Sequence, residues 1–581
     1  MKNATYKDYV IKLERYNIIT PGQTVDYISW WENNYSVKVM GSFLENEEAF
    51  EKVLGGVLPK EDLFLAKFML NNAFFRDKDP FIQASQIIFL KDNLAKIIEK
   101  NKDKNIVIEF DSKQKNNISR IACVLNICKS YPNVKIRISK NMRQSYFLYR
   151  NLLMKTAYPF ALWAHYFAEC LWSSVCRIAR EKRAVKKKLI LSNYRHYTKN
   201  DEDNPFWANF TKLMKLSGNS DFEIAYYLAP TSASAAYYVS QLRDKQHIFF
   251  NDFLSFKDYF SNLRAYFKKR KKTPKKISYF YQGEDYGEAI KPLVDAFFYM
   301  FYPPFLKSKS ALLRLLQESP EMIFTDSEMN LPAMQLGFLR GKAKLFVMTN
   351  EIISEIYAAL PITDQSKRPS FDIKFVYNEE AKKILVEQFK YPAQKLVVFP
   401  DPRFLEGAIA KREIENKILL ISQTFSSFYK FTNNFNRLIK NTELKQKFEL
   451  VFKPHPHERV NPEKIIDEDI TYLKEKKLSF TPKYAVNASS TLGMELLFQG
   501  SVVFFLDKVE FGVGKYFGIA ANLPFLVCYN ENDVLKKILL LEKDKALYEK
   551  TRQDIDKFLK NEYSMQELDV LLKKLTTYVK P

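Results

Sequence analysis

Short apolar runs of strand length alternate with helical stretches along most of the chain from residue 105 onward. The first example is a run at 105–110, a helical stretch at 118–129 and a second run at 134–138. Strands that are apolar throughout and separated by helices are typical of a parallel sheet with helices on both faces. The pattern therefore predicts an α/β fold. Further strand-like runs follow at 188–192, 222–227, 277–280, 322–325, 344–348, 371–377 and 396–400.

The alternation is interrupted at about 400–415, where Asp401-Pro402-Arg403 breaks the regular pattern. We place an inter-domain linker here, because proline and polar residues between two periodic segments are typical of a connection. A second β/α series follows, so the sequence predicts two Rossmann-like domains. In the second series we expect strands at 417–423, 448–453, 485–488 and 500–505, and helices at 433–440, 493–498 and 534–579.

Residues 1–100 show mostly helical periodicity with scattered aromatic side chains. We interpret them as a helical N-terminal extension in front of the two domains. The chain has 581 residues, which at roughly 150 residues per domain is enough for this arrangement. The predicted division is an extension at 1–100, an N-terminal Rossmann-like domain at 101–400 with an amphipathic basic segment at 157–188, a C-terminal Rossmann-like domain at 415–545, and C-terminal helices at 546–581.

The net charge is +23, from 90 basic and 67 acidic residues. Such an excess attracts anionic partners such as nucleic acid, acidic lipid headgroups or phosphorylated substrates. Arg177–Lys188 holds seven bases and one acid, and Lys268–Lys276 holds seven bases and no acid. An ordinary solvated face explains each run equally well. Because no nucleic-acid-binding motif accompanies the runs, nucleic acid is not an expected partner.

The five cysteines are odd in number and fit no zinc-ligand spacing, which indicates reduced thiols and a cytoplasmic protein. The N-terminus is polar and lacks the apolar segment of a secretory signal. The run 157–176 is apolar except for residues such as His165 and Glu169, and it leads into a basic segment. It fits either a helix that lies on an anionic membrane or a helix buried in the core. A peripheral contact with the inner membrane is therefore one expectation.

Lys453-Pro454-His455-Pro456-His457 begins at the end of the predicted strand 448–453. In open parallel sheets, ligands bind beyond the carboxyl ends of the strands. The prolines restrict the backbone around His455, and a fixed imidazole beside Lys453 can donate a hydrogen bond to a phosphate while the ammonium group neutralises its charge. A structural histidine is the alternative, but two of the five histidines of the chain lie in this motif. The motif therefore predicts a phosphate site.

Ser489 and Ser490 lie at the next predicted strand-to-helix junction. Hydroxyl and backbone N–H groups at a helix N-terminus make an anion site, although serine is also an ordinary N-cap. The pair follows the His-Pro motif by about 35 residues, on the next strand–helix unit, so we expect both motifs to contact one phosphate. Glu495, in the following helix, is a candidate acceptor for ribose hydroxyls, with an ordinary surface carboxylate as the alternative.

The segment FELVFKPHPHE, followed by YAVNASSTLGMELLFQGSVVFFL, resembles the donor-binding half of bacterial glycosyltransferases that use CMP-activated acidic sugars, namely the sialyltransferases and the capsule Kdo transferases. The resemblance implies a GT-B-like fold, with a nucleotide-sugar-binding C-terminal domain and an acceptor-binding N-terminal domain. In those families the His-Pro and Ser-Ser motifs hold the CMP phosphate, and the matching residues here are His455, Pro456, Ser489 and Ser490. Together with Lys453, these motifs give Lys453, His455, Ser489 and Ser490 as the expected donor-phosphate-binding residues. FVYNEEAKKILVEQFKYPAQKLVVFPDPRF, which precedes this half, is similar to the same region of these enzymes and of teichoic-acid polymerases.

An enzyme of this kind needs a general base that deprotonates the acceptor hydroxyl. The best candidates are Glu284 and Asp285, which follow the predicted strand 277–280, with a surface turn as the alternative. Glu109 and Asp111 are the second choice. The sequence holds no metal-ligand cluster, no dinucleotide fingerprint and no Gly-rich phosphate loop, so neither a metal nor a cofactor is expected.

We therefore expect a metal-independent glycosyltransferase that moves a sialic-acid-like or Kdo-like sugar from a CMP donor to a cell-surface polysaccharide or glycolipid. Two alternatives stay open. One is a polyol-phosphate transferase of the teichoic-acid type that uses a CDP-linked donor. The other is a non-catalytic nucleic-acid-binding or assembly protein that has kept the fold.

Replacing His455 by alanine is expected to lower the rate of sugar transfer by about two to three orders of magnitude, the usual effect of losing one preorganised charge-stabilising donor. The rate is measured as donor consumption by mass spectrometry, and the thermal unfolding midpoint should change little. Near wild-type transfer by this variant would show that His455 is a structural residue.

Overall fold

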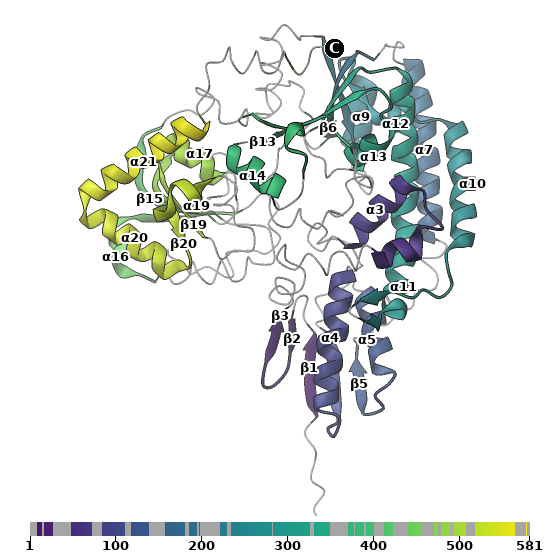
Figure 1. The fold of residues 1–581 in the computed structure, drawn as a ribbon, viewed down its shortest axis with the longest axis horizontal. Coiled ribbons are helices and arrows are strands. Elements are labelled where there is room, and N and C mark those ends of the chain that lie inside the picture. The colour runs from purple at the N-terminus through teal and green to yellow at the C-terminus, as the bar shows by residue number, and fades with distance from the viewer. Residues whose placement is uncertain are drawn as a thin grey trace, which may run out of the picture.

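A computed structural model gives the fold (Figure 1). In the part of the chain that the structure describes, it contains three large sheets and one two-stranded sheet. The C-terminal sheet and its helices lie on one side of the molecule in this view, and the helices of the central unit lie on the other. The described residues are 8–13, 17–26, 48–71, 84–110, 118–138, 157–179, 185–194, 197, 221–228, 234–281, 283–325, 331–348, 370–376, 378–387, 391–399, 412–421, 440–454, 470–473, 478–487, 490, 492–506, 518–563 and 577.

The first unit is a mixed five-stranded sheet with the order β3-β2-β1-β4-β5. β1, β4 and β5 run parallel, and β2 and β3 extend the other edge in antiparallel pairs. The strands form because short apolar runs such as that of β4 are buried beneath α4 and α5. Its elements are β1 (Tyr9–Leu13), β2 (Asn17–Ile19), β3 (Thr24–Asp26), α4 (Ala84–Lys100), β4 (Ile106–Phe110), α5 (Ile118–Cys128) and β5 (Val134–Arg137).

The second unit is a seven-stranded parallel sheet with the order β14-β13-β12-β11-β6-β7-β8. The chain proceeds from β6 to β8 in one direction, then returns to the other side of β6 at β11 and continues to β14. This reversal of strand order is the topology of a Rossmann-like sheet. The strands are β6 (Lys188–Asn193), β7 (Phe222–Tyr227), β8 (Ile248–Phe249), β11 (Met322–Thr325), β12 (Lys344–Met348), β13 (Ile373–Val376) and β14 (Leu396–Val398).

Both faces of the central sheet are buried, as the uninterrupted apolar runs predict. Leu189 and Leu191 of β6 belong to the main core, whereas Ile190 belongs to a second cluster on the opposite face. In that second cluster, phenylalanines of β11, β12 and β13 stack on one another, with ring centroids 4.8 and 6.4 Å apart. The helical elements of this unit are α7 (Tyr158–Ala179), α9 (Ala235–Arg243), η5 (Phe250–Phe253), α10 (Phe256–Lys272), α11 (Gly287–Ala296), η6 (Phe297–Phe301), α12 (Tyr302–Gln317), α13 (Leu331–Leu339), α14 (Glu379–Glu387) and η9 (Ala393–Lys395).

A buried carboxylate on a further helix, which packs against α4, joins the first unit to the second. Asp62 of α3 (Lys60–Asn71) accepts hydrogen bonds from Tyr302 Oη at 2.8 Å and from Lys269 Nζ at 3.2 Å. Lys309 Nζ lies 3.3 Å from its other oxygen. Because α10 and α12 both contribute to this cluster, α3 is held against the helices that cover the central sheet.

The third unit is a six-stranded parallel sheet with the order β17-β16-β15-β18-β19-β20. The strand order reverses at β15 as it does at β6, so this sheet is also Rossmann-like. Its elements are β15 (Ile414–Ile421), α16 (Thr442–Lys447), β16 (Glu449–Lys453), β17 (Thr471–Tyr472), β18 (Thr481–Asn487), α17 (Leu492–Gln499), β19 (Val502–Leu506), α19 (Ile519–Asn522), η12 (Pro524–Leu526), β20 (Val527–Cys528), α20 (Glu531–Lys543) and α21 (Lys545–Tyr563).

Two Rossmann-like sheets in succession confirm the predicted α/β, GT-B-like fold class. Residues 1–100 contain the long helices α3 (Lys60–Asn71) and α4, but they also contain β1, β2 and β3, and β1 pairs with β4 across the expected boundary. Backbone hydrogen bonding to a later strand outweighs the local helical periodicity here. The expected linker falls between β14 and β15, and most of it, 400–411, lies outside the described residues. So do 433–439 and most of 564–581.

The run 277–280 is not a strand of the central sheet. Instead, β9 (Phe280–Tyr281) pairs antiparallel with β10 (Glu284–Asp285) in a separate two-stranded sheet. The turn between them contains Gly283, whose φ of 79° lies in the left-handed region that glycine adopts without strain. The strand expected to present a base at the edge of the parallel sheet is therefore part of a hairpin.

α7 packs one face on the central unit through a buried carboxylate. Glu169 is 2% exposed, and Lys307 Nζ of α12 lies 2.6 Å from its Oε2. Tyr238 Oη of α9 and Asn251 Nδ2 of η5 donate hydrogen bonds to Oε1 at 2.9 and 3.1 Å. His165 Nδ1 lies 3.4 Å from Oε2. The segment 157–176 is thus a core helix on this face, and no helix in the described part of the chain is long and apolar enough to cross a bilayer.

The charge of Glu169 depends on these partners. Burial alone would raise the pKa of Glu169, but the positive charge of Lys307 and the interaction with His165 outweigh it and lower the pKa from 4.5 to about 2. A carboxylate whose pKa is depressed by folding stabilises the fold above its unfolded pKa. This contribution is therefore present above about pH 4.5 and is lost as the pH falls toward 2.

Replacing Lys307 by methionine is expected to lower the free energy of unfolding at pH 7 by about 3–5 kcal/mol, because it leaves the Glu169 carboxylate buried without its cation. Urea denaturation at pH 7 measures the change. Adding Glu169→Gln to the same variant should recover much of the loss, since no buried charge then remains unpaired. A Lys307→Met variant as stable as the wild type would contradict this role of the ion pair.

Candidate functional site

The two predicted phosphate motifs begin on either side of one strand. Ile421, the last residue of β15, is in register with Lys453 of β16 on one side and with Asn487 of β18 on the other. Because neighbouring strands are about 4.8 Å apart, the backbones of Lys453 and Asn487 lie about 10 Å apart at the same edge. The strand order reverses here, and α/β sheets bind ligands in the crevice at such reversals. The structure therefore brings the starting points of both motifs to one candidate site.

The side chain of Asn487 holds the turn that carries Ser490. Asn487 is fully buried, and its Oδ1 accepts a hydrogen bond from Ser490 N at 3.1 Å while its Nδ2 donates to Ser490 O at 2.9 Å. Ser490 Oγ in turn accepts from Leu492 N at 3.3 Å, at the start of α17. Ser490 therefore acts as a helix cap, as the alternative interpretation of the serine pair proposed, and its position is fixed on the end of β18.

Gly493 lets α17 approach β18 closely. A Cβ atom at this position would lie 2.3 Å from Asn487 Nδ2 and 2.7 Å from Asn487 Cγ, closer than any real contact. The absence of a side chain thus allows the N-terminus of α17 to sit directly above the carboxyl end of the strand. The first N–H groups of a helix carry partial positive charge, which favours an anion at this position.

Of the other predicted donor-site residues, two are described by the structure and two are not. Lys453 is half-buried at the end of β16, and Glu495 is half-buried in the first turn of α17. His455 and Ser489 lie outside the described residues. The carboxyl edge of the sheet thus holds Lys453, Ser490 and Glu495 on adjacent elements.

The predicted base candidates lie in the β9–β10 hairpin. Asp285 Oδ1 accepts hydrogen bonds from Tyr279 N at 2.9 Å and from Gly287 N at 2.8 Å, and Lys91 Nζ of α4 donates to the Asp285 carbonyl at 3.0 Å. Asp285 therefore holds the turn that precedes α11. These contacts are those expected if the segment is a surface turn, which was the alternative to a general base. Glu284 is described only by its backbone, which pairs with Tyr281.

Of the two second-choice base candidates, only one lies in the described part of the chain. Glu109 of β4 makes an ion pair with Arg137 of β5 at 3.0 Å on the first sheet, and Asp111 lies outside the described residues. Within the part of the chain that the structure describes, no group of three or more His, Cys, Asp and Glu side chains has the geometry of a metal site.

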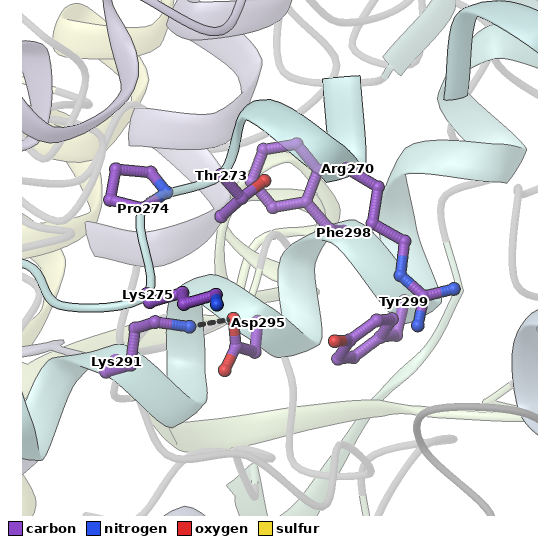
Figure 2. Close-up of a pocket in the computed structure, with 8 residues that line it drawn as sticks. All are labelled: Arg270, Thr273, Pro274, Lys275, Lys291, Asp295, Phe298 and Tyr299. Atoms are coloured by element: carbon purple, nitrogen blue, oxygen red, sulfur yellow. Dashed lines mark hydrogen bonds and ion pairs between the residues drawn. The ribbon is translucent and has the colours of Figure 1, made fainter. Parts of the chain in front are cut away.

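A pocket of about 370 Å³ lies away from these motifs, at the C-terminal end of α10 (Figure 2). Arg270 packs over the ring of Tyr299 with 4.8 Å between guanidinium carbon and ring centroid. Lys291 forms an ion pair with Asp295 on the other side of the pocket. The lining residues are Arg270, Thr273, Pro274, Lys275, Lys291, Asp295, Phe298 and Tyr299.

Asn487 and Gly493 are the residues of the candidate site that the sequence prediction missed. The signal for them was an amide side chain at a strand end, three residues before Ser490 and six before a glycine that opens a helix. An asparagine in that position commonly hydrogen-bonds the backbone that follows it. A glycine in the first helical turn of a β/α unit permits close helix–strand packing.

No family profile matches the sequence. A stretch of 177 residues is 37% identical to an uncharacterised protein of Methanocaldococcus jannaschii. The match comprises 29% of this chain and 32% of that protein, so the chain covers about a third of the curated relative. This is too little of either chain to assign a family.

Several solved structures share the fold at low similarity. An O-GlcNAc transferase of Thermobaculum terrenum is 12% identical with a TM-score of 0.38 over 95% of both chains. A glycosyltransferase of Rickettsia africae is 12% identical with a TM-score of 0.37 over 67% of this chain and 96% of its own. A UDP-GlcNAc 2-epimerase of Neisseria meningitidis is 10% identical with a TM-score of 0.37 over 63% and 93%. At these scores the likeness does not bear on activity.

Replacing Gly493 by alanine is expected to lower the free energy of unfolding by about 1–3 kcal/mol, because the new methyl group overlaps the Asn487 amide. Chemical denaturation measures the change. Gly56→Ala is the matched control: nothing lies within 4 Å of its Cβ position, so it should change stability by less than about 1 kcal/mol. Equal effects of the two substitutions would contradict the close approach of α17 to β18.

Proposed function

We propose that the protein is a glycosyltransferase that moves a sialic-acid-like or Kdo-like sugar from a CMP-activated donor to a cell-surface polysaccharide or glycolipid. The observation that carries the proposal is the register of Ile421 with both Lys453 and Asn487. It supports one phosphate site where the strand order of a Rossmann-like sheet reverses. The resemblance of the segments around Lys453 and Ser490 to CMP-sugar-dependent enzymes supplies the donor class.

The donor phosphate would lie between the ends of β16 and β18. A span of about 10 Å between the two strand ends accommodates one phosphate with a donor on each side. Lys453 and His455 would approach from β16, and Ser489, Ser490 and the first N–H groups of α17 would approach from β18. Because Ser490 Oγ accepts a hydrogen bond from Leu492 N, its O–H proton remains available for a phosphate oxygen.

Transfer would break the bond between the anomeric carbon and the phosphate oxygen. The acceptor hydroxyl oxygen attacks that carbon, its proton passes to a general base, and CMP leaves with the bonding electron pair. The cationic and N–H groups at the strand ends would stabilise the charge that develops on the leaving phosphate. Glu495, in the first turn of α17, would accept hydrogen bonds from the ribose and thus orient the nucleotide.

We assign the base to Glu284 ahead of Asp285. The Asp285 Oδ1 atom is engaged by two backbone N–H groups, so replacing it would disturb the turn as well as any proton transfer. Glu284→Gln is therefore the variant that tests the base, and Asp285→Asn reports on the turn.

The reaction would take place in the cytoplasm, at the inner membrane. All five cysteines are described and none forms a disulfide, which supports a reducing compartment. A glycolipid or growing surface glycan at the inner face of the membrane would be the acceptor.

The wild-type protein is expected to consume CMP-sialic acid or CMP-Kdo. Mass spectrometry measures donor consumption over a panel that also contains CDP-glycerol and UDP-N-acetylglucosamine. Lys453→Met should weaken CMP binding by about ten- to a hundredfold, the effect of one lost charge-assisted hydrogen bond. Lys550→Met, at an exposed position of α21, is the charge-matched control and should bind CMP normally.

The alternatives give different results in the same assay. Consumption of CDP-glycerol alone would identify a polyol-phosphate transferase. Salt-sensitive oligonucleotide binding without any thermal shift from CMP or CDP would identify a non-catalytic protein and overturn the proposal.

A further inference from the structure

The outward face of α7 is apolar. Of the nine described side chains of this helix that are exposed, eight are apolar, whereas its buried face carries the charged Glu169. Phe160 and Ile178, near the two ends, are 76% and 87% exposed, and Leu171 and Val175 are each 49% exposed. A surface helix normally has the reverse arrangement. Large apolar patches on a protein surface usually mark an interaction site.

α10 lies beside α7 and continues this surface (Figure 1). Phe167 of α7 contacts the rings of Phe256 and Tyr259 at 5.2 and 5.4 Å, and Tyr259 contacts Phe260 at 5.1 Å. Phe260 and Phe267 are 59% and 48% exposed. The row of exposed rings therefore passes from one helix to the other.

The rest of the exposed face of α10 is basic. Its eight exposed side chains comprise five Lys or Arg residues, two Phe and one Ser. Among the described residues of α7 and α10, no exposed side chain is acidic. Charge and apolar surface of this kind together complement an anionic lipid surface.

The two helices run antiparallel, and this places positive charge at both ends of the apolar row. Trp163, near the start of α7, packs on Tyr266 toward the end of α10, with ring centroids 5.5 Å apart. Arg177, near the end of α7, donates a hydrogen bond to the carbonyl of Leu254, just before α10. The exposed bases of the last turns of α10, Lys268, Lys271 and Lys272, thus lie near the start of α7.

We propose that α7 and α10 form a surface that binds an anionic lipid bilayer, with the helices lying parallel to it. α7 has 22 residues, which corresponds to about 33 Å. No described helix can span a bilayer, and the proposed contact lies at the interface. Phe160, Phe167, Leu171 and Ile178 enter the headgroup region, and the bases of α10 bind anionic headgroups.

The pocket at the end of α10 lies where this basic end begins (Figure 2). Arg270, Lys275 and Lys291 line it, against the single acid Asp295, which pairs with Lys291. In Figure 2, Lys275 and Lys291 lie on one side of the pocket and Arg270 lies on the other, beside Tyr299. The pocket therefore carries a net positive charge at the same end of α10 as Lys268, Lys271 and Lys272.

Sedimentation with lipid vesicles tests the surface on the full chain. The protein should sediment with vesicles of phosphatidylcholine and phosphatidylglycerol, and binding to vesicles of phosphatidylcholine alone should be weaker. Added salt should weaken the binding further, because it screens the basic residues. No binding to either vesicle would overturn the proposal. The measurement needs neither donor nor acceptor, so its outcome is independent of the proposed transferase activity.

Two triple variants separate the apolar and basic parts. Phe160→Ser, Leu171→Gln and Ile178→Gln together should weaken binding at least about tenfold, because exposed apolar groups no longer enter the interface. Lys268→Glu, Lys271→Glu and Lys272→Glu together should weaken binding to anionic vesicles on the order of a hundredfold. All six positions are exposed, so circular dichroism and the unfolding midpoint should stay at wild-type values.

Matched controls are available on the C-terminal unit. Lys550→Glu, Lys557→Glu and Lys560→Glu on α21 make the same charge change at exposed positions. Ile414→Gln, Tyr529→Gln and Leu540→Gln remove partly exposed apolar groups. Neither set should alter vesicle binding by more than about twofold. Equal losses in these controls would mean that net charge or general hydrophobicity causes binding, and would overturn the assignment to α7 and α10.

A second copy of the chain is the competing occupant of this surface. Light scattering on the wild type and on the apolar triple variant distinguishes it from a bilayer. A dimer that the triple variant converts to a monomer, without a change in vesicle binding, would show that the face joins two protomers and would overturn the proposal. A monomer in both cases, with vesicle binding lost only in the variant, is the expected result.

Discussion

The parallel pairing of β15 with both β16 and β18 is the constraint on which the C-terminal unit depends. A strand that accepts parallel neighbours on both sides must be buried on both faces, and the apolar run of β15 meets that requirement. The same pairing forces the chain to leave β15 toward one side and return on the other. Loops that are more than 30 residues apart in sequence therefore begin within about 10 Å of each other, and the candidate site is a consequence of the strand order.

The strand order brings the two loops together, and local packing then fixes the position of the turn at Ser490. Asn487 uses its amide to hold the turn at Ser490, and Gly493 leaves the space that this amide occupies. The two residues therefore form one unit, in which the side chain of the last residue of β18 makes hydrogen bonds to the backbone of the turn that follows. The central sheet has the same reversal of strand order at β6, so the chain repeats one topology with different local details.

Most of the parallel strands could be predicted from the sequence, because apolar runs such as 322–325 and 344–348 are buried on both faces and carry a clear signal. The short strands β1, β2 and β3 could not, since they are only partly buried. β1 gains its conformation by pairing with distant β4, and β2 and β3 extend the sheet from β1. The run at 277–280 was misleading because Asp285 binds the backbone N–H of Tyr279 and holds the segment in a hairpin.

The candidate site was predictable in part. Lys453 and Ser490 lie at the same sheet edge as expected, while the phosphate-binding roles assigned to Lys453, His455, Ser489 and Ser490 stay predictions. Periodicity also could not tell which face of 157–176 is buried, because apolar residues surround that helix and its one carboxylate points inward. The sequence pattern specifies that α7 is a helix, whereas the ion pair with Lys307 determines its orientation.

The inward position of Glu169 has a consequence for how α7 can meet a lipid surface. Many amphipathic peptides are unfolded in water and gain their helix when they reach the lipid. α7 is already bound to α9, η5 and α12 through the Glu169 carboxylate. Separating α7 from these elements would break the ion pair between Glu169 and Lys307. On the proposed membrane-binding surface, α7 would therefore act as a preformed rigid helix, so attachment and release would carry no refolding step and could be as rapid as diffusion to the surface allows.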